Sequence, residues 1–167
     1  MRLDRNAALV VIDVQKGFDT PGIWGKRNNP EAERNIVALC ELWQATERPM
    51  VCVRHTADRI VSPFASWSPG RQLKKQLADV RFDVTIEKSV RSAFIGQPDL
   101  KEWLMTAGIR QLVVTGIQTN MCVESTVRMG SDLGFKMVLP IDATHTFDAR
   151  RGDTTVSADE LRDMTAA

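Results

Sequence analysis

Cysteine and histidine are scarce in this chain, with three and two residues among 167. The cysteines, Cys40, Cys52 and Cys122, are an odd number without the spacing of a disulfide framework, which predicts free thiols in a reducing compartment. His55 has no second histidine nearby, so a built-in metal site is not expected. The chain also lacks the Gly-x-Gly-x-x-Gly and Gly-Lys-Ser/Thr motifs of nucleotide-binding proteins. We therefore expect no cofactor.

Long apolar runs and clustered charges are also missing. The longest purely apolar run, residues 7–12, is far shorter than the roughly 20 residues of a membrane helix. Lys and Arg number 22 against 21 Asp and Glu, which gives a formal net charge of +1, and no basic block stands out. Neither nucleic acid nor a membrane is therefore an expected partner. The N-terminus has no apolar signal-peptide core behind it, which predicts a cytoplasmic protein.

The residues that are present are those of one folded domain. Hydrophobic residues make up 43% and charged residues 26%, the balance of an ordinary globular protein. A chain of this length can bury a core of its own. There is no internal repeat and no low-complexity linker, so residues 1–167 are treated as a single domain.

Short apolar runs alternate with amphipathic stretches along the chain. Strands are predicted at residues 8–12, 50–53, 82–87, 112–115 and 136–139, and helices at about 30–43, 73–77, 98–107, 121–133 and 156–164. Asn29 is expected to cap the first helix, with Pro30 at its first position. This alternation predicts βαβ units and an α/β fold, in which helices cover both faces of a parallel sheet.

Three polar residues stand where the predicted strands end. Asp13 ends the first strand, Lys88 follows the third, and Cys122 follows the fourth. In an open parallel sheet the active site lies at the carboxyl ends of the strands, near the point where the strand order reverses. We therefore expect these three side chains to meet at that edge of the sheet.

Each of these residues suits a chemical role and also has an ordinary alternative. A thiol in the first turn of a helix feels the positive end of the macrodipole, which favours the thiolate of Cys122. A lone cysteine is otherwise a small buried apolar residue, and Cys40 and Cys52 are assigned to that class. Burial raises the pKa of a carboxyl group, which suits Asp13 to proton transfer, although a helix cap or a metal ligand is also possible. Lysines are usually surface charges, but an ammonium beside these two groups would stabilise carboxylate and thiolate together.

Loop residues are candidates for contacts with a substrate. The aromatic candidates are Phe18, Trp24, Phe64, Trp67 and Phe94, and the candidates to meet a carboxylate are Arg54, Arg91 and His55. Of these, Phe18, His55, Phe64 and Phe94 are predicted to line a pocket. His145, like His55, is assigned a structural or substrate-lining role, and the sequence does not choose between these roles.

The ordered set of motifs resembles the isochorismatase-like cysteine hydrolase superfamily over nearly the whole chain. The matching pieces are residues 11–15 with Phe18, residues 53–55, 62–64 and 68–70, Lys88 with residues 92–94, residues 116–117 with Thr119 and Cys122, and residues 142–144. The resemblance implies a Rossmann-like three-layer sandwich with a parallel sheet of five to six strands. It also implies a homo-oligomer, a dimer or larger, that acts on a small-molecule substrate. Relatives usually continue further, so the domain is expected to lack its C-terminal helix or strand.

The resemblance further implies a catalytic role for each candidate residue. Asp13 would be the general base, Lys88 its electrostatic partner, and Cys122 the nucleophile that forms a thioester. Backbone N–H groups of Gln118 and Cys122 would form the oxyanion hole. The family usually carries a non-proline cis peptide in this loop, which maps onto the bond between Ile117 and Gln118.

Differences from the motifs of individual subfamilies narrow the range of reactions expected of this chain. Nicotinamidases of this superfamily carry an Asp and two His as metal ligands after the second strand, and the second His is missing here before Trp67. True isochorismatases cleave a vinyl ether without a thiol nucleophile, so Cys122 favours hydrolysis of an amide or N-carbamoyl C–N bond. An isochorismatase-type ether hydrolase and a non-catalytic binding module remain alternatives. A thiol redox protein is a further alternative, although the chain lacks a Cys-x-x-Cys pair.

Overall fold

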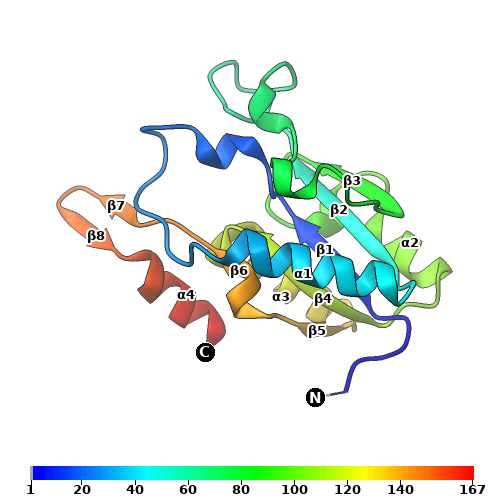
Figure 1. Cartoon of the computed structure of the whole chain (residues 1–167). Helices are drawn as coiled ribbons and strands as arrows, with labels where there is room; N and C mark the ends of the chain where they lie inside the picture. Colours follow the sequence, from blue (N-terminus) through cyan, green and yellow to red (C-terminus); the bar gives the residue numbers. More distant parts are fainter. Residues whose placement is uncertain (1) are drawn as a thin grey trace.

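Six strands form the central sheet of the computed structural model, which describes residues 2–167 (Figure 1). They are β1 (Ala8–Ile12), β2 (Met50–His55), β3 (Val84–Lys88), β4 (Gln111–Ile117), β5 (Lys136–Val138) and β6 (Thr144–His145). The strand order is β3-β2-β1-β4-β5, β6 also pairs with β4, and all these pairs are parallel. The predicted α/β fold with its parallel sheet is confirmed.

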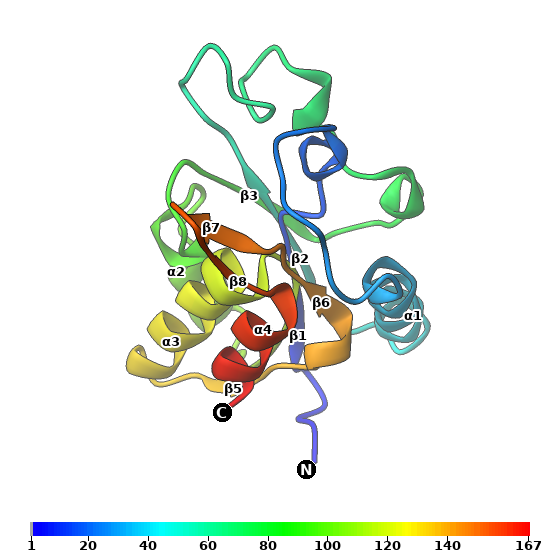
Figure 2. The ribbon, with the colours of Figure 1, turned by 90° about the vertical axis from the view of Figure 1, so that its left-hand side faces the viewer.

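Helices cover both faces of this sheet. They are α1 (Ala32–Ala45), α2 (Leu100–Thr106), α3 (Glu124–Asp132) and α4 (Ala158–Ala166), with a π-helical turn, η5 (Thr119–Val123), just before α3. Short 3-10 turns are η1 (Lys16–Asp19), η2 (Pro69–Arg71), η3 (Lys75–Leu77), η4 (Ala93–Ile95) and η6 (Ile141–Ala143). Figure 2 shows α1 on one side of the sheet and α2, α3 and α4 on the other. None of the helices formed by the described residues is long and apolar enough to cross a membrane.

The two apolar cores lie on opposite faces of β1, whose five residues are all buried. Val10 and Ile12 pack with residues of α2, whereas Leu9 and Val11 pack with residues of α1. Side chains alternate between the faces of a strand, so a strand buried on both faces must be apolar at every position. The unbroken apolar run at residues 8–12 therefore predicted this strand correctly.

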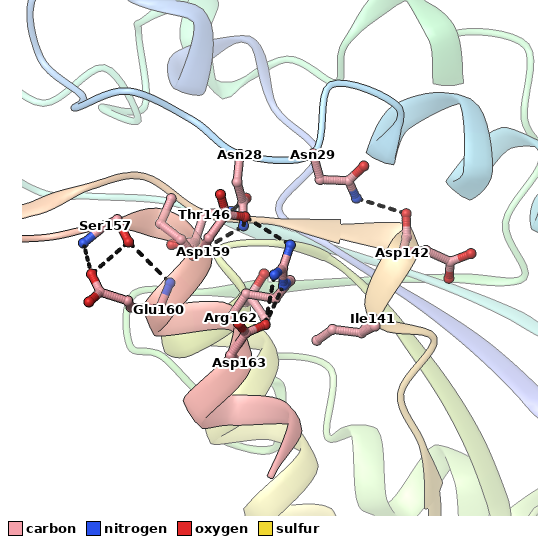
Figure 3. A network of polar contacts seen from close by, with 12 residues as sticks. Asn28, Asn29, Ile141, Asp142, Thr146, Ser157, Asp159, Glu160, Arg162 and Asp163 are labelled. Atoms are coloured by element: carbon pink, nitrogen blue, oxygen red, sulfur yellow. Dashed lines mark hydrogen bonds and ion pairs between the residues drawn. The ribbon is translucent and has the colours of Figure 1, made fainter.

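Asn29 does not cap α1, contrary to the prediction, and Pro30 precedes the helix. The N-cap residue is Glu31, whose side chain makes no capping hydrogen bond. The Asn29 amide donates instead to the carbonyl oxygens of Asp142 and Thr144, at 2.8 and 2.6 Å (Figure 3). These acceptors lie more than a hundred positions away in the sequence, so the local capping pattern could not reveal them.

The C-terminal segment is fastened to the loop before α1. The buried Asn28 side chain accepts a hydrogen bond from the Thr146 backbone N–H and donates to the carbonyl of Ala158, the first residue of α4. Figure 3 shows Asn28 beside Thr146 and the start of α4. Thr146 in turn donates to Asn120 in η5, at 2.6 Å. These bonds connect α4 and the residue after β6 to the turn that carries Cys122.

Between β6 and α4 lies a small antiparallel hairpin that the sequence did not predict. Its strands are β7 (Ala149–Arg151) and β8 (Thr154–Val156). Four of their six residues are exposed and polar, so no apolar periodicity marks them. The predicted helix at residues 73–77 is also shorter than expected, because only the 3-10 turn η3 forms there.

Candidate active site

Asp13, Lys88 and Cys122 meet at the carboxyl edge of the sheet. Asp13 follows β1 and Cys122 lies in η5, after β4. These two strands are neighbours, and the strand order reverses between them. Lys88 is the last residue of β3 rather than the residue after it, and its long side chain reaches Asp13 past β2. The structure thus brings together the three residues that the sequence singled out.

Asp13 and Lys88 form a buried ion pair. The distance between Lys88 Nζ and Asp13 Oδ2 is 2.6 Å, and the side chains are 0% and 1% exposed. Burial raises the pKa of Asp13, while the charge and hydrogen bond of Lys88 act in the opposite direction. Asp13 Oδ1 accepts no hydrogen bond from any residue between 2 and 167, so this oxygen is free to accept a proton. Asp13 also has a φ of +53°, a conformation that aspartate tolerates and that often occurs at functional sites.

Cys122 is a thiol rather than the thiolate expected from its place at a helix start. Burial and the negative charge of Asp13 raise the pKa of Cys122 to about 12, against a smaller lowering by Lys88. Burial and the Asp13 charge both arise from tertiary packing, and together they outweigh the effect of the helix end on this pKa. Asp13 is the carboxylate next to this thiol, and burial raises its pKa as well.

The segment between β4 and Cys122 has an unusual backbone. The peptide bond between Ile117 and Gln118 is cis, as the resemblance implies. Gly116 has a φ of +126°, and a Cβ at this position would lie 2.0 Å from the carbonyl oxygen of Ile12. Only glycine allows β4 to approach β1 so closely at the point where the chain turns into η5.

A cleft of about 540 Å³ opens over these residues. Its lining consists of Asp13, Phe18, Trp24, His55, Phe64, Ser89, Val90, Arg91, Gln118, Met121 and Cys122. Phe18 contacts Trp24 and Phe64 at ring distances of 4.9 and 4.8 Å, and Phe147 stacks on Trp24 at 5.4 Å. We call Phe18, Trp24, Phe64 and Phe147 the aromatic wall. Three of the four predicted lining residues, Phe18, His55 and Phe64, line this cleft.

The fourth, Phe94, was predicted wrongly. Its side chain is buried in the core on the α2 side of the sheet and stacks on Phe135, with ring centroids 5.6 Å apart. Trp67 also lies outside the cleft, because it is exposed and borders a separate hollow with Arg54 and Arg71. An aromatic residue after a strand end can point to either face of the sheet, and local sequence does not decide which.

The two histidines have different places. His55 lines the cleft, and burial and the Lys88 charge lower its pKa, so it is neutral near pH 7. Gln15 holds the His55 backbone by accepting from its N–H at 2.8 Å and donating to its carbonyl at 3.0 Å, a role that the sequence did not reveal. His145 is fully buried and lies 3.5 Å from Glu33, outside the cleft lining. Among residues 2–167, no group of three or more His, Cys, Asp or Glu side chains is placed to hold a metal ion.

A group of charges, buried at Glu33, Lys74 and His145, lies next to the aromatic wall. We call it the Lys74 cluster; its members are Asp19, Arg27, Glu33, Lys74 and His145. Lys74 Nζ contacts carboxylate oxygens of Asp19 and Glu33 at 2.6 and 2.8 Å, and Arg27 binds Glu33 through two hydrogen bonds. The cluster therefore ties the loop that carries Phe18 and Trp24 to α1. No sequence pattern predicted this cluster, because its members are scattered along the chain and look like surface charges.

The other two cysteines are buried packing residues, as predicted. Cys40 and Cys52 are 0% and 2% exposed, and both are free thiols. Burial raises the pKa of each to about 12. Neither lines the cleft, whereas Cys122 does.

Comparison with known proteins assigns the family. A model of the isochorismatase domain matches residues 7–167. The chain belongs to the isochorismatase family. Solved structures agree with this assignment: an isochorismatase-family protein from Chromobacterium violaceum superimposes with a TM-score of 0.92 at 34% sequence identity, covering 99% of this chain and 86% of the other. The protein is thus an isochorismatase-family hydrolase with the parallel sheet of that family.

Two relatives illustrate the range of this family. The isochorismatase family protein YrdC of Bacillus subtilis is 37% identical over 166 residues, which are 99% of this chain and 88% of YrdC. The ureidoacrylate amidohydrolase RutB of Klebsiella pneumoniae is 43% identical over 74 residues, which are 44% of this chain and 31% of RutB.

Proposed function

We propose that this isochorismatase-family hydrolase cleaves a small amide or N-carbamoyl C–N bond through a thioester on Cys122. The observation that carries the proposal is the position of Asp13 between Lys88 and the Cys122 thiol, with one carboxylate oxygen open. A base and a nucleophile that line one cleft, with a cation buried beside them, are the parts that acyl transfer needs. The similarity to an amidohydrolase over 74 residues supports the same reaction class.

The first half-reaction forms the thioester. Asp13 takes the proton from the Cys122 thiol as the sulfur attacks the carbonyl carbon of the substrate. The Lys88 side chain stabilises the negative charge while this charge moves from the Asp13 carboxylate to the sulfur and then to the carbonyl oxygen. The tetrahedral intermediate collapses, the C–N bond breaks, and Asp13 returns the proton to the leaving nitrogen. Ammonia or an amine departs and the acyl group remains on Cys122.

The second half-reaction regenerates the enzyme. Water enters the cleft, gives a proton to Asp13, and attacks the thioester carbon. The C–S bond then breaks, and Asp13 returns the proton to the sulfur. The net reaction adds one water molecule to the substrate and yields a carboxylic or carbamic acid together with ammonia or an amine.

The oxyanion of both intermediates needs donors that are already in place. The backbone N–H groups of Gln118 and Cys122 are our assignment, since both residues line the cleft around the cis peptide. Donors of this kind stabilise the transition state because they do not have to reorganise during the reaction.

Mass spectrometry tests this mechanism. The protein is incubated with a panel of small carboxamides and N-carbamoyl compounds, and intact mass and released ammonia are measured. We expect an acyl-sized mass gain on the wild type and none on Cys122→Ala, with Cys52→Ala as the matched control that behaves like wild type. Asp13→Asn should keep the fold but lose turnover. If no compound gives an adduct or releases ammonia, the amidase proposal is wrong, and an ether hydrolase or a binding module becomes the better assignment.

A further inference from the structure

The charges that line the cleft do not cancel. Asp13 and Arg91 are its only lining residues with charged side chains among those described, because His55 is neutral. The charge of Asp13 is already matched by Lys88 at 2.6 Å. Arg91 makes no ion pair and no side-chain hydrogen bond with any residue between 2 and 167. One guanidinium charge therefore remains uncompensated at the cleft.

The other candidates for binding an anion are occupied or neutral. The Lys88 ammonium is fully buried on Asp13 and is not part of the cleft lining. Arg54 pairs with Glu87, which also binds Arg71, and neither arginine lines this cleft. Both arginines border a separate hollow, where they share one carboxylate. The sequence suggested three residues that could meet a carboxylate, Arg54, Arg91 and His55. Of these, Arg91 is the one that lines the cleft with an unpaired charge.

The backbone that carries Arg91 is fixed relative to the nucleophile. Two residues later, the Ala93 N–H donates to Thr126 Oγ1 at 3.0 Å, and the Thr126 hydroxyl donates to the carbonyl oxygen of Cys122 at 2.7 Å. On the other side, Lys88 holds the start of the same segment to Asp13. An arginine on this segment can therefore recognise a group at a restricted distance from the reacting carbonyl.

We propose that Arg91 determines specificity by binding a carboxylate of the substrate. This inference rests on the proposed function and adds a substrate class to it: short amides or N-carbamoyl compounds that carry an anionic group. A guanidinium binds a carboxylate through two parallel hydrogen bonds, which fixes both position and orientation. Three members of the aromatic wall, Phe18, Trp24 and Phe64, line the same cleft and would pack against the apolar part of the substrate between its two polar ends.

A series of three probes of similar size tests the charge preference. Succinamate carries a carboxylate, butanamide carries a methyl group at the same place, and 3-aminopropanamide carries an ammonium. Wild-type kcat/KM for ammonia release should be about 10- to 100-fold higher for succinamate than for butanamide, the range expected of one charge-assisted contact. Arg91→Gln should remove this preference, because it should raise KM for succinamate about 10-fold or more relative to any change in KM for butanamide. Arg91→Glu should favour 3-aminopropanamide.

Arg110→Gln is the matched control, because it removes the same charge from an exposed residue just before β4, at the opposite edge of the sheet. It should leave the preference for succinamate intact. Equal turnover of the three probes by wild type, or an equal loss on succinamate and butanamide in Arg91→Gln, overturns the assignment of Arg91.

A binding measurement separates this inference from the proposed function. Calorimetry on Cys122→Ala measures binding of succinamate without turnover, and the affinity should fall about 10-fold or more in Cys122→Ala with Arg91→Gln. Binding that depends on Arg91, without ammonia release by the wild type from any probe, supports the carboxylate site and refutes the hydrolase proposal. Neither binding nor ammonia release with any probe refutes both.

Discussion

Replacing Lys88 with methionine leaves a single charge buried beside the cleft. Lys88 Nζ and Asp13 Oδ2 are 2.6 Å apart, and both side chains are almost fully buried. Loss of one partner from a buried ion pair costs about 3–5 kcal/mol, because the remaining charge is no longer compensated. Near pH 8, Lys88→Met should therefore lower the free energy of unfolding by about 3 kcal/mol or more.

This cost should depend on pH in a direction that the structure fixes. Burial already raises the pKa of Asp13, and Lys88→Met removes the cation that opposes this shift. A carboxyl group with a higher pKa in the folded than in the unfolded protein stabilises the fold at low pH, and this contribution is lost as the pH rises. The loss in free energy of unfolding caused by Lys88→Met should thus become smaller from about pH 8 to pH 5, by up to about 1.4 kcal/mol per pH unit where Asp13 titrates.

Urea unfolding followed by tryptophan fluorescence measures these free energies. Adding Asp13→Asn to Lys88→Met removes the isolated charge and should restore stability to within about 1 kcal/mol of wild type, whereas activity should not return. Asp13→Asn alone is the matched control, because it removes the other partner of the same ion pair and leaves the Lys88 side chain buried without its carboxylate. The reasoning is refuted if Lys88→Met lowers the free energy of unfolding equally at pH 8 and pH 5 and the double variant is less stable than Lys88→Met.

Three further predictions concern single positions. Gly116→Ala should lower the free energy of unfolding by more than about 4 kcal/mol or prevent folding, because its Cβ would lie 2.0 Å from the Ile12 carbonyl oxygen. Thermal unfolding measures this effect. Gly134→Ala is the control, because Gly134 also has a positive φ but has open space around it. Burial raises the pKa of Glu33, but hydrogen bonds within the Lys74 cluster outweigh this and hold it far below its usual value. Glu33 therefore stabilises the fold above about pH 4.5 and loses this effect as the pH falls, so Glu33→Gln should show a flatter acid decline in urea unfolding, and an identical slope would contradict this. Alkylation of Cys122 by iodoacetamide, read by peptide mass mapping, should keep rising to about pH 10, because its pKa is raised to about 12; a plateau near pH 7 would indicate a thiolate instead.

The sequence predicted the sheet and the three residues at its carboxyl edge because both depend on short-range pattern. The run at residues 8–12 is apolar at every position, which only a strand buried on both faces requires. Once the strands were assigned, the rule that sites lie at strand ends predicted that Asp13, Lys88 and Cys122 would lie together.

Predictions that depended on distant neighbours were wrong or missing. The protonation of Cys122 follows from burial and from Asp13, which is 109 positions earlier, rather than from its own helix. Asn29 bonds to carbonyls near β6 instead of capping α1, and Phe94 turns into the core on the α2 side. The same limit hid the Lys74 cluster, whose pairs form only when the loop before α1 folds back.

The reactive parts of this protein are separated by most of the chain. Asp13 and Cys122 become neighbours only when β1 pairs with β4, and the connection between these strands contains α1, β2, β3 and α2. Parallel pairing of distant segments is slow, because the loop must close before the new contacts stabilise it. In the proposed mechanism Asp13 is the base for Cys122, and a chain that is still being synthesised cannot bring the two together until β4 has left the ribosome and docked. Turnover would therefore report a finished fold rather than a partial one.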